Sequence, residues 1–329
     1  MKATKKLIIA SVSLVAAASL AVGATFAWFS YRSNVELGSV QFGVGSGDEN
    51  LLVAVAKVGE TPAESSFAYT LSEETIKGVI NEGSDITYQP LTVRGASGEV
   101  GATDAITLEK QGGSNATDSD YAQFDLVFRY TPAAGNSTMP YLILNDGSVI
   151  TADPADDASY SSSITAWWSA EEEGTYQNKY GPSIATGGTI KARARDAARV
   201  AFIYGDSSSK TNKIWAPSEE QAPSVTTSDS PSGYYKNNLA SDYAKHLGAT
   251  LSDVVTPTYA SRVYAADNGQ SDTINNTIAQ FPAISGGKSY SELKITVKVW
   301  LEGKDGDCLP SVAGDQFAFL LKFKTGTVS

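Results

Sequence analysis

Apolar and polar residues alternate along several short segments of this 329-residue chain. A strand that buries one face carries an apolar residue at every second position, so this period predicts β-strands. The two strongest segments, residues 293–301 and 317–323, place a branched or aromatic residue at every odd number. Weaker segments of the same kind occur at residues 40–44, 121–130 and 200–204, with a near-continuous apolar run at 51–58.

Local signals predict a hairpin and two helices among these strands. Asn145-Asp146-Gly147 separates two apolar runs, Tyr141–Leu144 and Ser148–Thr151, which is the pattern of a β-hairpin. A short helix is expected within Ser72–Asn81, with Ser72 as its N-cap. Apolar residues at helical spacing predict a second helix within Gly233–Leu247.

The many short strands, separated by turn residues, predict an all-β fold. We expect a jelly-roll-like β-sandwich, because strands at this spacing form two packed sheets. Residues 152–290 are richer in Ser, Asn and Gly, and we interpret this range as long loop and helix insertions. Residues 28–329 are therefore predicted to form a single domain.

The first 27 residues have the features of a secretory signal. Lys2, Lys5 and Lys6 precede the uncharged apolar run Leu7–Gly23, and small residues before Trp28 suit cleavage after Ala27. The alternative is an uncut helix that anchors the chain, because the first charge after Lys6 is Arg32. Either reading exports the remaining chain, so we expect a secreted or cell-surface protein.

Composition narrows the classes of function. The formal net charge is −11, and loss of the three leader lysines lowers it to −14, which argues against nucleic acid as a partner. Cys308 is the only cysteine, so no intrachain disulfide can form. His246 is the only histidine, which removes most zinc sites and hydrolase triads. We expect no enzymatic activity and no bound cofactor, calcium excepted.

Two motifs give the chain a resemblance to a known group. Gly23-Ala-Thr-Phe-Ala-Trp-Phe-Ser30 at the leader and Val299-Trp-Leu-Glu-Gly-Lys-Asp-Gly-Asp-Cys308 near the C-terminus resemble the exported TasA/camelysin-like proteins of Gram-positive bacteria. Signals in that group are cut by a dedicated SipW-type signal peptidase. The resemblance implies a jelly-roll subunit that polymerises with copies of itself into pilus-like biofilm-matrix fibres. Some members are classed as metalloproteases, but this chain has no His-Glu-x-x-His motif.

The resemblance also implies how the subunits join. In that family the segment freed by signal cleavage adds as a donor strand to the neighbouring subunit, a form of β-augmentation. Carried over here, the donor lies within Trp28–Val44, and its apolar residues are Trp28, Phe29, Tyr31, Val35, Leu37, Val40, Phe42 and Val44. The alternative is that this segment pairs within its own sheet as an ordinary first strand.

Three further groups of residues have two readings each. Glu302, Asp305 and Asp307 lie in a Gly-rich turn, where they either bind calcium or form a solvated connection. Cys308 is either an intermolecular link or a buried small hydrophobe. Arg199 and the basic run at 191–195 either contact an acidic neighbour or belong to a solvated sheet face.

The sequence therefore supports two functions. The first is an extracellular structural subunit that forms filaments by strand donation. The second is a monomeric or membrane-anchored surface adhesin or matrix protein, in contact with cell-surface or matrix polymers. A secreted hydrolase ranks third, because no spacing of carboxylates here indicates a catalytic pair.

Overall fold

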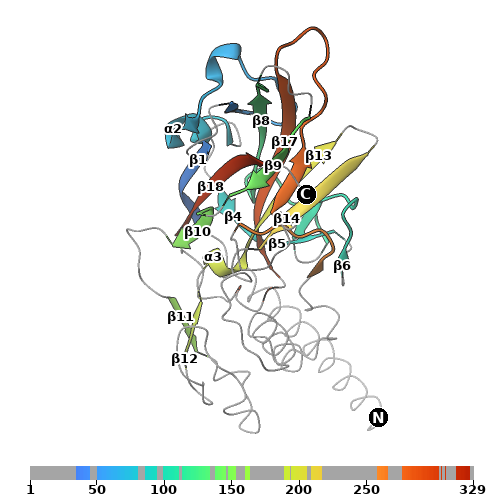
Figure 1. Ribbon diagram of the computed structural model, residues 1–329. Coiled ribbons are helices and arrows are strands. Elements are labelled where there is room, and N and C mark those ends of the chain that lie inside the picture. The colour runs from blue at the N-terminus through green and yellow to red at the C-terminus, as the bar shows by residue number, and fades with distance from the viewer. Residues whose placement is uncertain are drawn as a thin grey trace, which may run out of the picture.

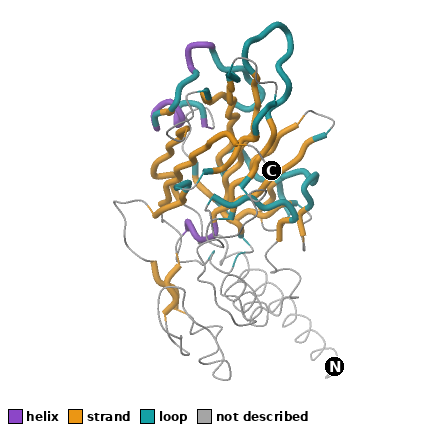
Figure 2. The backbone as a smooth tube through the Cα atoms, in the orientation of Figure 1, coloured by secondary structure: helices purple, strands orange, loops and turns teal. Residues whose placement is uncertain are grey.

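The alternating segments form two seven-stranded sheets that face each other across an apolar core (Figure 1). The architecture is an all-β sandwich, as the sequence predicts, and helices make up little of the described chain (Figure 2). The computed structural model describes residues 35–44, 50–80, 86–94, 99–110, 113–133, 138–145, 147–152, 160–163, 189–192, 194–205, 209–216, 258–265, 276–303, 305, 308 and 316–326.

The first sheet, sheet A, contains both the first and the last described strand. At its centre β18 (Gln316–Gly326) pairs in antiparallel fashion with β9 (Tyr141–Leu144) and β10 (Val149–Ala152). On its other side it pairs in parallel with β1 (Val35–Val44). The sheet is completed by β16 (Thr277–Gln280), β3 (Thr70–Leu71) and β4 (Thr87–Tyr88).

The second sheet, sheet B, is built around β17 (Ser291–Glu302). β13 (Ala198–Gly205) pairs with one side of β17, and β8 (Ala122–Tyr130) pairs with the other. β14 (Lys210–Trp215) lies beyond β13, and β2 (Leu51–Ala56) lies beyond β8. Near the end of β17 the sheet adds β5 (Pro90–Val93) and β7 (Leu108–Lys110).

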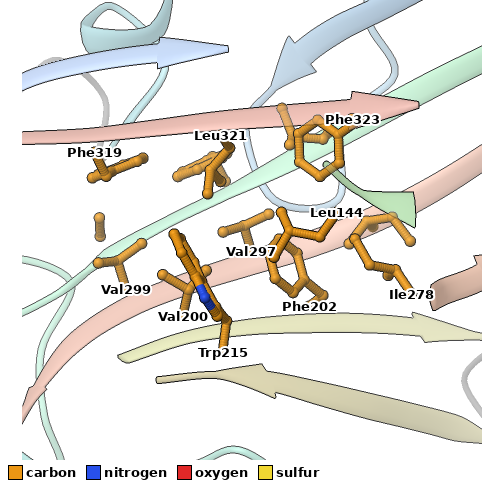
Figure 3. Packing of buried hydrophobic residues seen from close by; sticks show 14 of the residues in the cluster. Leu144, Val200, Phe202, Trp215, Ile278, Val297, Val299, Phe319, Leu321 and Phe323 are labelled. Atoms are coloured by element: carbon orange, nitrogen blue, oxygen red, sulfur yellow. The ribbon is translucent and has the colours of Figure 1, made fainter. Parts of the chain in front are cut away.

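The core between the sheets is made by the apolar residues at alternate positions. Figure 3 shows Phe319, Leu321 and Phe323 of β18 pointing toward Val297 of β17 and Phe202 of β13. These side chains are fully or almost fully buried, and burial of each one contributes about 1.5–3 kcal/mol. The alternation that predicts the strands is therefore also what holds the sheets together.

A smaller apolar cluster lies on the opposite face of sheet B. Ala201 and Trp300 belong to it, and each alternates along its strand with residues of the main core. Tyr259 joins the cluster from β15 (Thr258–Tyr259), which pairs in parallel with β6 (Glu99–Val100). Sheet B is thus buried on both faces at this end. A separate pair of strands consists of β11 (Tyr160–Ser163) and β12 (Thr189–Ala192).

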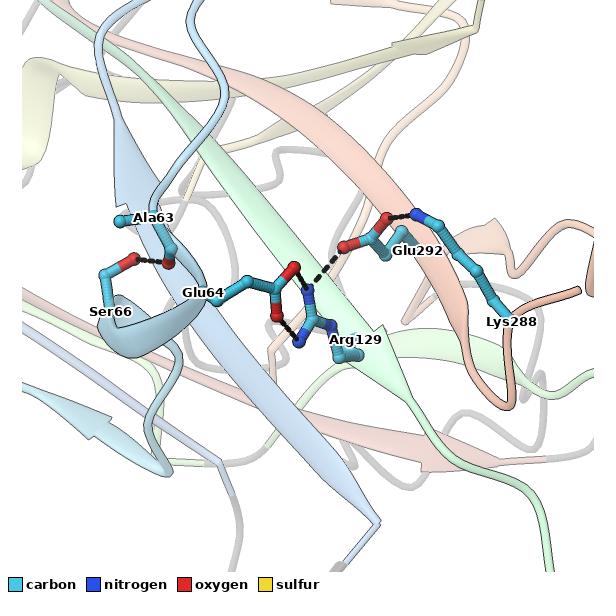
Figure 4. Close-up of polar contacts among 6 residues, drawn as sticks. All are labelled: Ala63, Glu64, Ser66, Arg129, Lys288 and Glu292. Atoms are coloured by element: carbon cyan, nitrogen blue, oxygen red, sulfur yellow. Dashed lines mark hydrogen bonds and ion pairs between the residues drawn. The ribbon is translucent and has the colours of Figure 1, made fainter. Parts of the chain in front are cut away.

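At the other end of sheet B, the segment that follows β2 folds over the outer face. Arg129 of β8 donates to both carboxylate oxygens of Glu64, at 2.7 and 3.1 Å, and to Glu292 at 2.8 Å (Figure 4). Its guanidinium lies 3.8 Å from the ring centroid of Phe67 and 4.0 Å from that of Tyr290. Glu64 begins the short 3-10 helix η1 (Glu64–Ser66), so this stack fixes the helix onto β8 and β17.

Asp125 shows how closely this segment covers the sheet. It lies on the outer face of β8, yet it is fully buried. Its carboxylate accepts from the Gly59 backbone N–H at 2.8 Å and from the Thr296 hydroxyl at 2.6 Å, and it pairs with Lys294 at 2.6 Å. Charge-assisted contacts of this kind offset the desolvation of the carboxylate.

The predicted hairpin at residues 141–151 is wrong. β9 and β10 do not pair with each other; both pair with β18, one after the other. The turn residues instead form an irregular link between two strands that continue in the same direction. In this link the Ser148 N–H donates to the Asn145 carbonyl at 3.1 Å. The Ser148 hydroxyl then bonds to both the N–H and the C=O of Lys322 on β18, at 2.9 and 3.1 Å. Pairing with a long central strand therefore overrides the local preference for reversal.

The predicted short helix is present as α2 (Glu73–Lys77). The Ser72 hydroxyl accepts from the Thr75 N–H at 3.2 Å, as expected of an N-cap. A second short α-helix among the described residues is α3 (Ala194–Ala197). Part of residues 152–290 belongs to the sandwich itself, since β13, β14 and β16 fall in this range. The helix predicted within 233–247 lies outside the described residues.

Candidate functional site

The strand β1 occupies a slot in sheet A between two walls. Along one wall, seven β1 residues are in parallel register with β18, from Glu36 opposite Gln316 to Val44 opposite Phe323. Along the other wall, β1 is antiparallel to β4 at Val35–Glu36 and to β3 at Phe42–Gly43. We call the space between β18 and the β3/β4 wall the β1 slot. In this chain the slot is filled by the chain's own β1, so the alternative of an ordinary first strand describes the single molecule.

The walls of the slot are attached to the rest of the fold independently of β1. β18 is held by β9 and β10. Just before β3, Ala68 exchanges two backbone hydrogen bonds with Val53 of β2, at 2.9 and 3.0 Å. Just after β4, the Gln89 N–H donates to the Asp120 carbonyl at 3.2 Å, and the chain continues into β5 of sheet B. Both strands of the β3/β4 wall are therefore tied to sheet B, whereas the β18 wall is held within sheet A.

Apolar side chains anchor the β3/β4 wall in the main core. Leu71 of β3, Ile76 of α2 and Tyr88 of β4 are all buried there. The ring of Tyr88 lies 4.9 Å from that of Phe317 on β18, which brings the two walls together beneath one end of β1. The Tyr88 hydroxyl is buried with no hydrogen-bond partner, and burial raises the pKa of this phenol far above its ordinary value.

The donor residues predicted from the resemblance divide into two groups. Val35, Leu37, Val40, Phe42 and Val44 all lie in β1, and the slot brings their backbone positions together. Trp28, Phe29 and Tyr31 lie outside the described residues, as does the whole leader, residues 1–27. Among the described residues, no helix is long and apolar enough to span a membrane.

A buried cluster of charges lies where β17 ends and the connection to β18 begins. Arg199 of β13 is fully buried and forms an ion pair with Asp305. Burial alone lowers the pKa of this guanidinium, but the charges of Asp305 and Glu302 outweigh burial and raise the pKa above its ordinary value. The reading of Arg199 as part of a solvated sheet face is therefore wrong.

Glu302 belongs to the same cluster. Its Oε2 atom lies 3.3 Å from the Tyr259 hydroxyl and 3.3 Å from the Trp300 Nε1, and both groups donate to it. Burial, and then the nearby Glu302 carboxylate, hold the pKa of Tyr259 well above its ordinary value, so Tyr259 keeps its proton and remains a donor. Because the partners of Glu302 come from the protein itself, we interpret the cluster as structural: it links the turn after β17 to sheet B.

The calcium hypothesis gains no support from this geometry. Asp305 faces the cation of Arg199, and Glu302 faces two donors. Asp307 lies outside the described residues, and among those described no group of three or more metal-ligating side chains comes together. A calcium site here stays a prediction. Cys308 is buried in the main core, as its reading as a small hydrophobe predicts.

Sequence reasoning missed two features of these sites. The parallel pairing of β1 with β18 joins residues almost three hundred positions apart, and no local pattern reports such a contact. The burial of Arg199 could have been predicted from the sequence. Val200 and Phe202 lie on one face of its strand, and the face that carries Arg199 is otherwise apolar as well.

A comparison of the chain with protein-family models, curated proteins and solved structures finds no match.

Proposed function

We propose that this protein is an extracellular structural subunit that assembles head to tail into a filament, with β1 of one copy occupying the β1 slot of the next. We assign the protein no catalytic activity. The leader and the Trp-Leu-Glu-Gly segment support the proposal by their resemblance to a fibre-forming family. The structural support is β1, a strand at the start of the described chain that is paired along both of its edges, in a slot whose walls are attached elsewhere.

Exchange of β1 between copies preserves every backbone contact that the strand makes. An identical strand from a second copy meets the same β18, β3 and β4, so the exchanged state keeps the pairing free energy of the single chain. Only the connection between β1 and β2, residues 45–49, needs a different path. A head-to-tail exchange of this kind continues into a fibre when the rotation between copies does not close a ring.

The second candidate function is a monomeric surface or matrix protein. One observation favours it: β1 fills the slot of its own chain, so the single molecule leaves no acceptor open in sheet A at this position. The two candidates differ only in whose β1 fills the slot. An experiment that reports this directly will therefore separate them.

A pair of cysteines placed across the slot provides this report. Gln41 of β1 lies opposite Leu320 of β18, so Gln41→Cys with Leu320→Cys sets two thiols on adjacent strands. If filaments form under reducing conditions and are then oxidised, β1 exchange predicts a ladder of covalent multimers on a denaturing gel. If the chain is oxidised as a monomer, the link closes within one molecule, and we expect no filament by electron microscopy until reductant is added.

Gln41→Cys alone is the matched control, because it has the β1 thiol but no partner on β18. It should assemble equally well with and without oxidant. Filaments of the double variant that oxidise to single-chain species would refute strand exchange. A chain that stays monomeric under all conditions would favour the second candidate.

A further inference from the structure

The strand β1 contains one more residue than its register on β18 requires. Leu37 lies opposite Phe317 and Val40 lies opposite Phe319, so three steps on β1 match two steps on β18. The extra residue falls at Gly38–Ser39, where the pairing is irregular. A β-bulge of this kind adds one residue to a strand and reverses its alternation from that point on.

This irregularity changes which β1 positions meet the buried positions of the walls. The residues of β18 opposite the apolar positions of β1 are all buried in the main core, namely Phe317, Phe319, Leu321 and Phe323. Tyr88, opposite Val35, is buried there as well. With the bulge, five apolar residues of β1 are in register with these five: Val35, Leu37, Val40, Phe42 and Val44.

Without the bulge the same strand would fit only in part. If regular pairing continued back from Val40 opposite Phe319, Gly38 would lie opposite Phe317 and Leu37 would lie opposite Gln316. Two apolar positions would then leave the register of the core. The remaining β1 positions suit the other face, since Gln41 and Gly43 lie opposite the partly exposed Leu320 and Lys322.

We infer that the β1 slot selects its strand by five apolar positions, each in register with a buried residue of the walls, and that the Gly38–Ser39 bulge is what brings β1 into this register. The strand selected is β1 itself, from the same chain or, where the inference rests on the proposed function, from a second copy. The slot thus discriminates by whether the apolar residues of a strand can reach this register. A segment of similar composition whose apolar residues fall out of register is rejected.

Two single-residue deletions in the full chain test this inference, because both shorten β1 equally and neither changes its charge. Deleting Ser39 removes the extra residue and leaves the five apolar residues at regular two-residue spacing. Deleting Gln41 makes Val40 and Phe42 neighbours, so Ser39 replaces Val40 opposite Phe319. Thermal unfolding of the isolated chain should therefore leave the Ser39 deletion within about 2 °C of the parent and lower the Gln41 deletion by about 5 °C.

Assembly gives the second measurement. The Ser39 deletion should enter mixed filaments with the unaltered chain, whereas the Gln41 deletion should be depleted from them several-fold. Equal loss of stability in the two deletions, or a larger loss for Ser39, overturns the inference. Unfolding of the isolated chain needs no filament, so failure of the unaltered chain to assemble would remove the proposed function and leave the comparison of deletions intact.

Discussion

Removal of the buried Arg199 guanidinium should be among the most damaging single changes in the described part of this protein. Arg199→Met keeps the length and apolar stem of the side chain but removes its charge. Asp305, which pairs with Arg199, is buried, and Glu302 beside it is fully buried. The variant therefore leaves two carboxylates in the cluster without the cation that faces them.

The magnitude follows from the burial of both partners. Breaking a buried ion pair by removing one partner costs about 3–5 kcal/mol, because the remaining charge is desolvated without compensation. That is a large share of the about 5–15 kcal/mol by which folded proteins are usually stable. At about 2–4 °C per kcal/mol, the unfolding midpoint should fall by about 10 °C.

Thermal unfolding followed by circular dichroism at pH 7 measures this loss. Asp305→Asn is the matched control, and the double variant should recover part of the loss, since neither charge of the pair is then left alone. The deficit of Arg199→Met should also shrink as the pH falls, because a buried carboxylate without its cation is relieved by taking up a proton. A variant within about 1 kcal/mol of the parent at pH 7 would refute the assigned role of the cluster.

Three further predictions use paired or single substitutions. Tyr88→Phe should stabilise the chain by about 1 kcal/mol, because it removes a buried hydroxyl with no partner, whereas Tyr259→Phe should destabilise it by a similar amount. Gly205→Ala should be severely destabilising, because the φ of Gly205 is 104° and an added Cβ would lie 2.1 Å from the backbone oxygen of Ser209. Gly59→Ala should cost only about 1–2 kcal/mol, because the φ of Gly59 is 89° but an added Cβ meets open space. Ser148→Ala should cost about 1–3 kcal/mol, because it removes the hydroxyl that bonds to the backbone of β18. Urea unfolding at pH 7 measures all five variants.

The raised pKa of Tyr88 adds a pH dependence to the first of these comparisons. The folded state holds the Tyr88 proton above the pH at which an unfolded tyrosine loses it, near 10. Titration of this group therefore leaves stability unchanged below pH 10, and stability falls as the pH rises further, because the unfolded state releases the proton first. The stability of Tyr88→Phe should fall less steeply above pH 10 than that of the parent. Parallel curves for the two proteins would contradict the assignment.

The strands that the sequence predicts well are those whose burial is set by their own alternation. β17 and β18 each bury one face in the main core, so the period of two in the sequence is the period of burial in the fold. The Ser72 cap is local in the same sense, because donor and acceptor lie three residues apart. Features of this kind need no knowledge of the rest of the chain.

The predictions that were wrong concern residues whose partners lie far away in sequence. Asn145-Asp146-Gly147 has the composition of a reversal, but β18 offers a longer strand to pair with and keeps the chain extended. Arg199 has the composition of a surface residue, but a carboxylate 106 positions later makes its burial tolerable. The walls of the β1 slot are non-local in the same way, so the strand in β1 could be predicted from the sequence and the strands that flank it could not.

The position of β18 has a consequence for the order in which the molecule can form. β1, β9 and β10 all pair with β18, so sheet A has no centre until β18 has been synthesised. Nascent β1 must wait for a partner that emerges much later, a contact of large sequence separation and hence slow closure. Synthesis through β18 thus becomes a built-in checkpoint, because a chain that stops before β18 lacks the template on which β1 would settle.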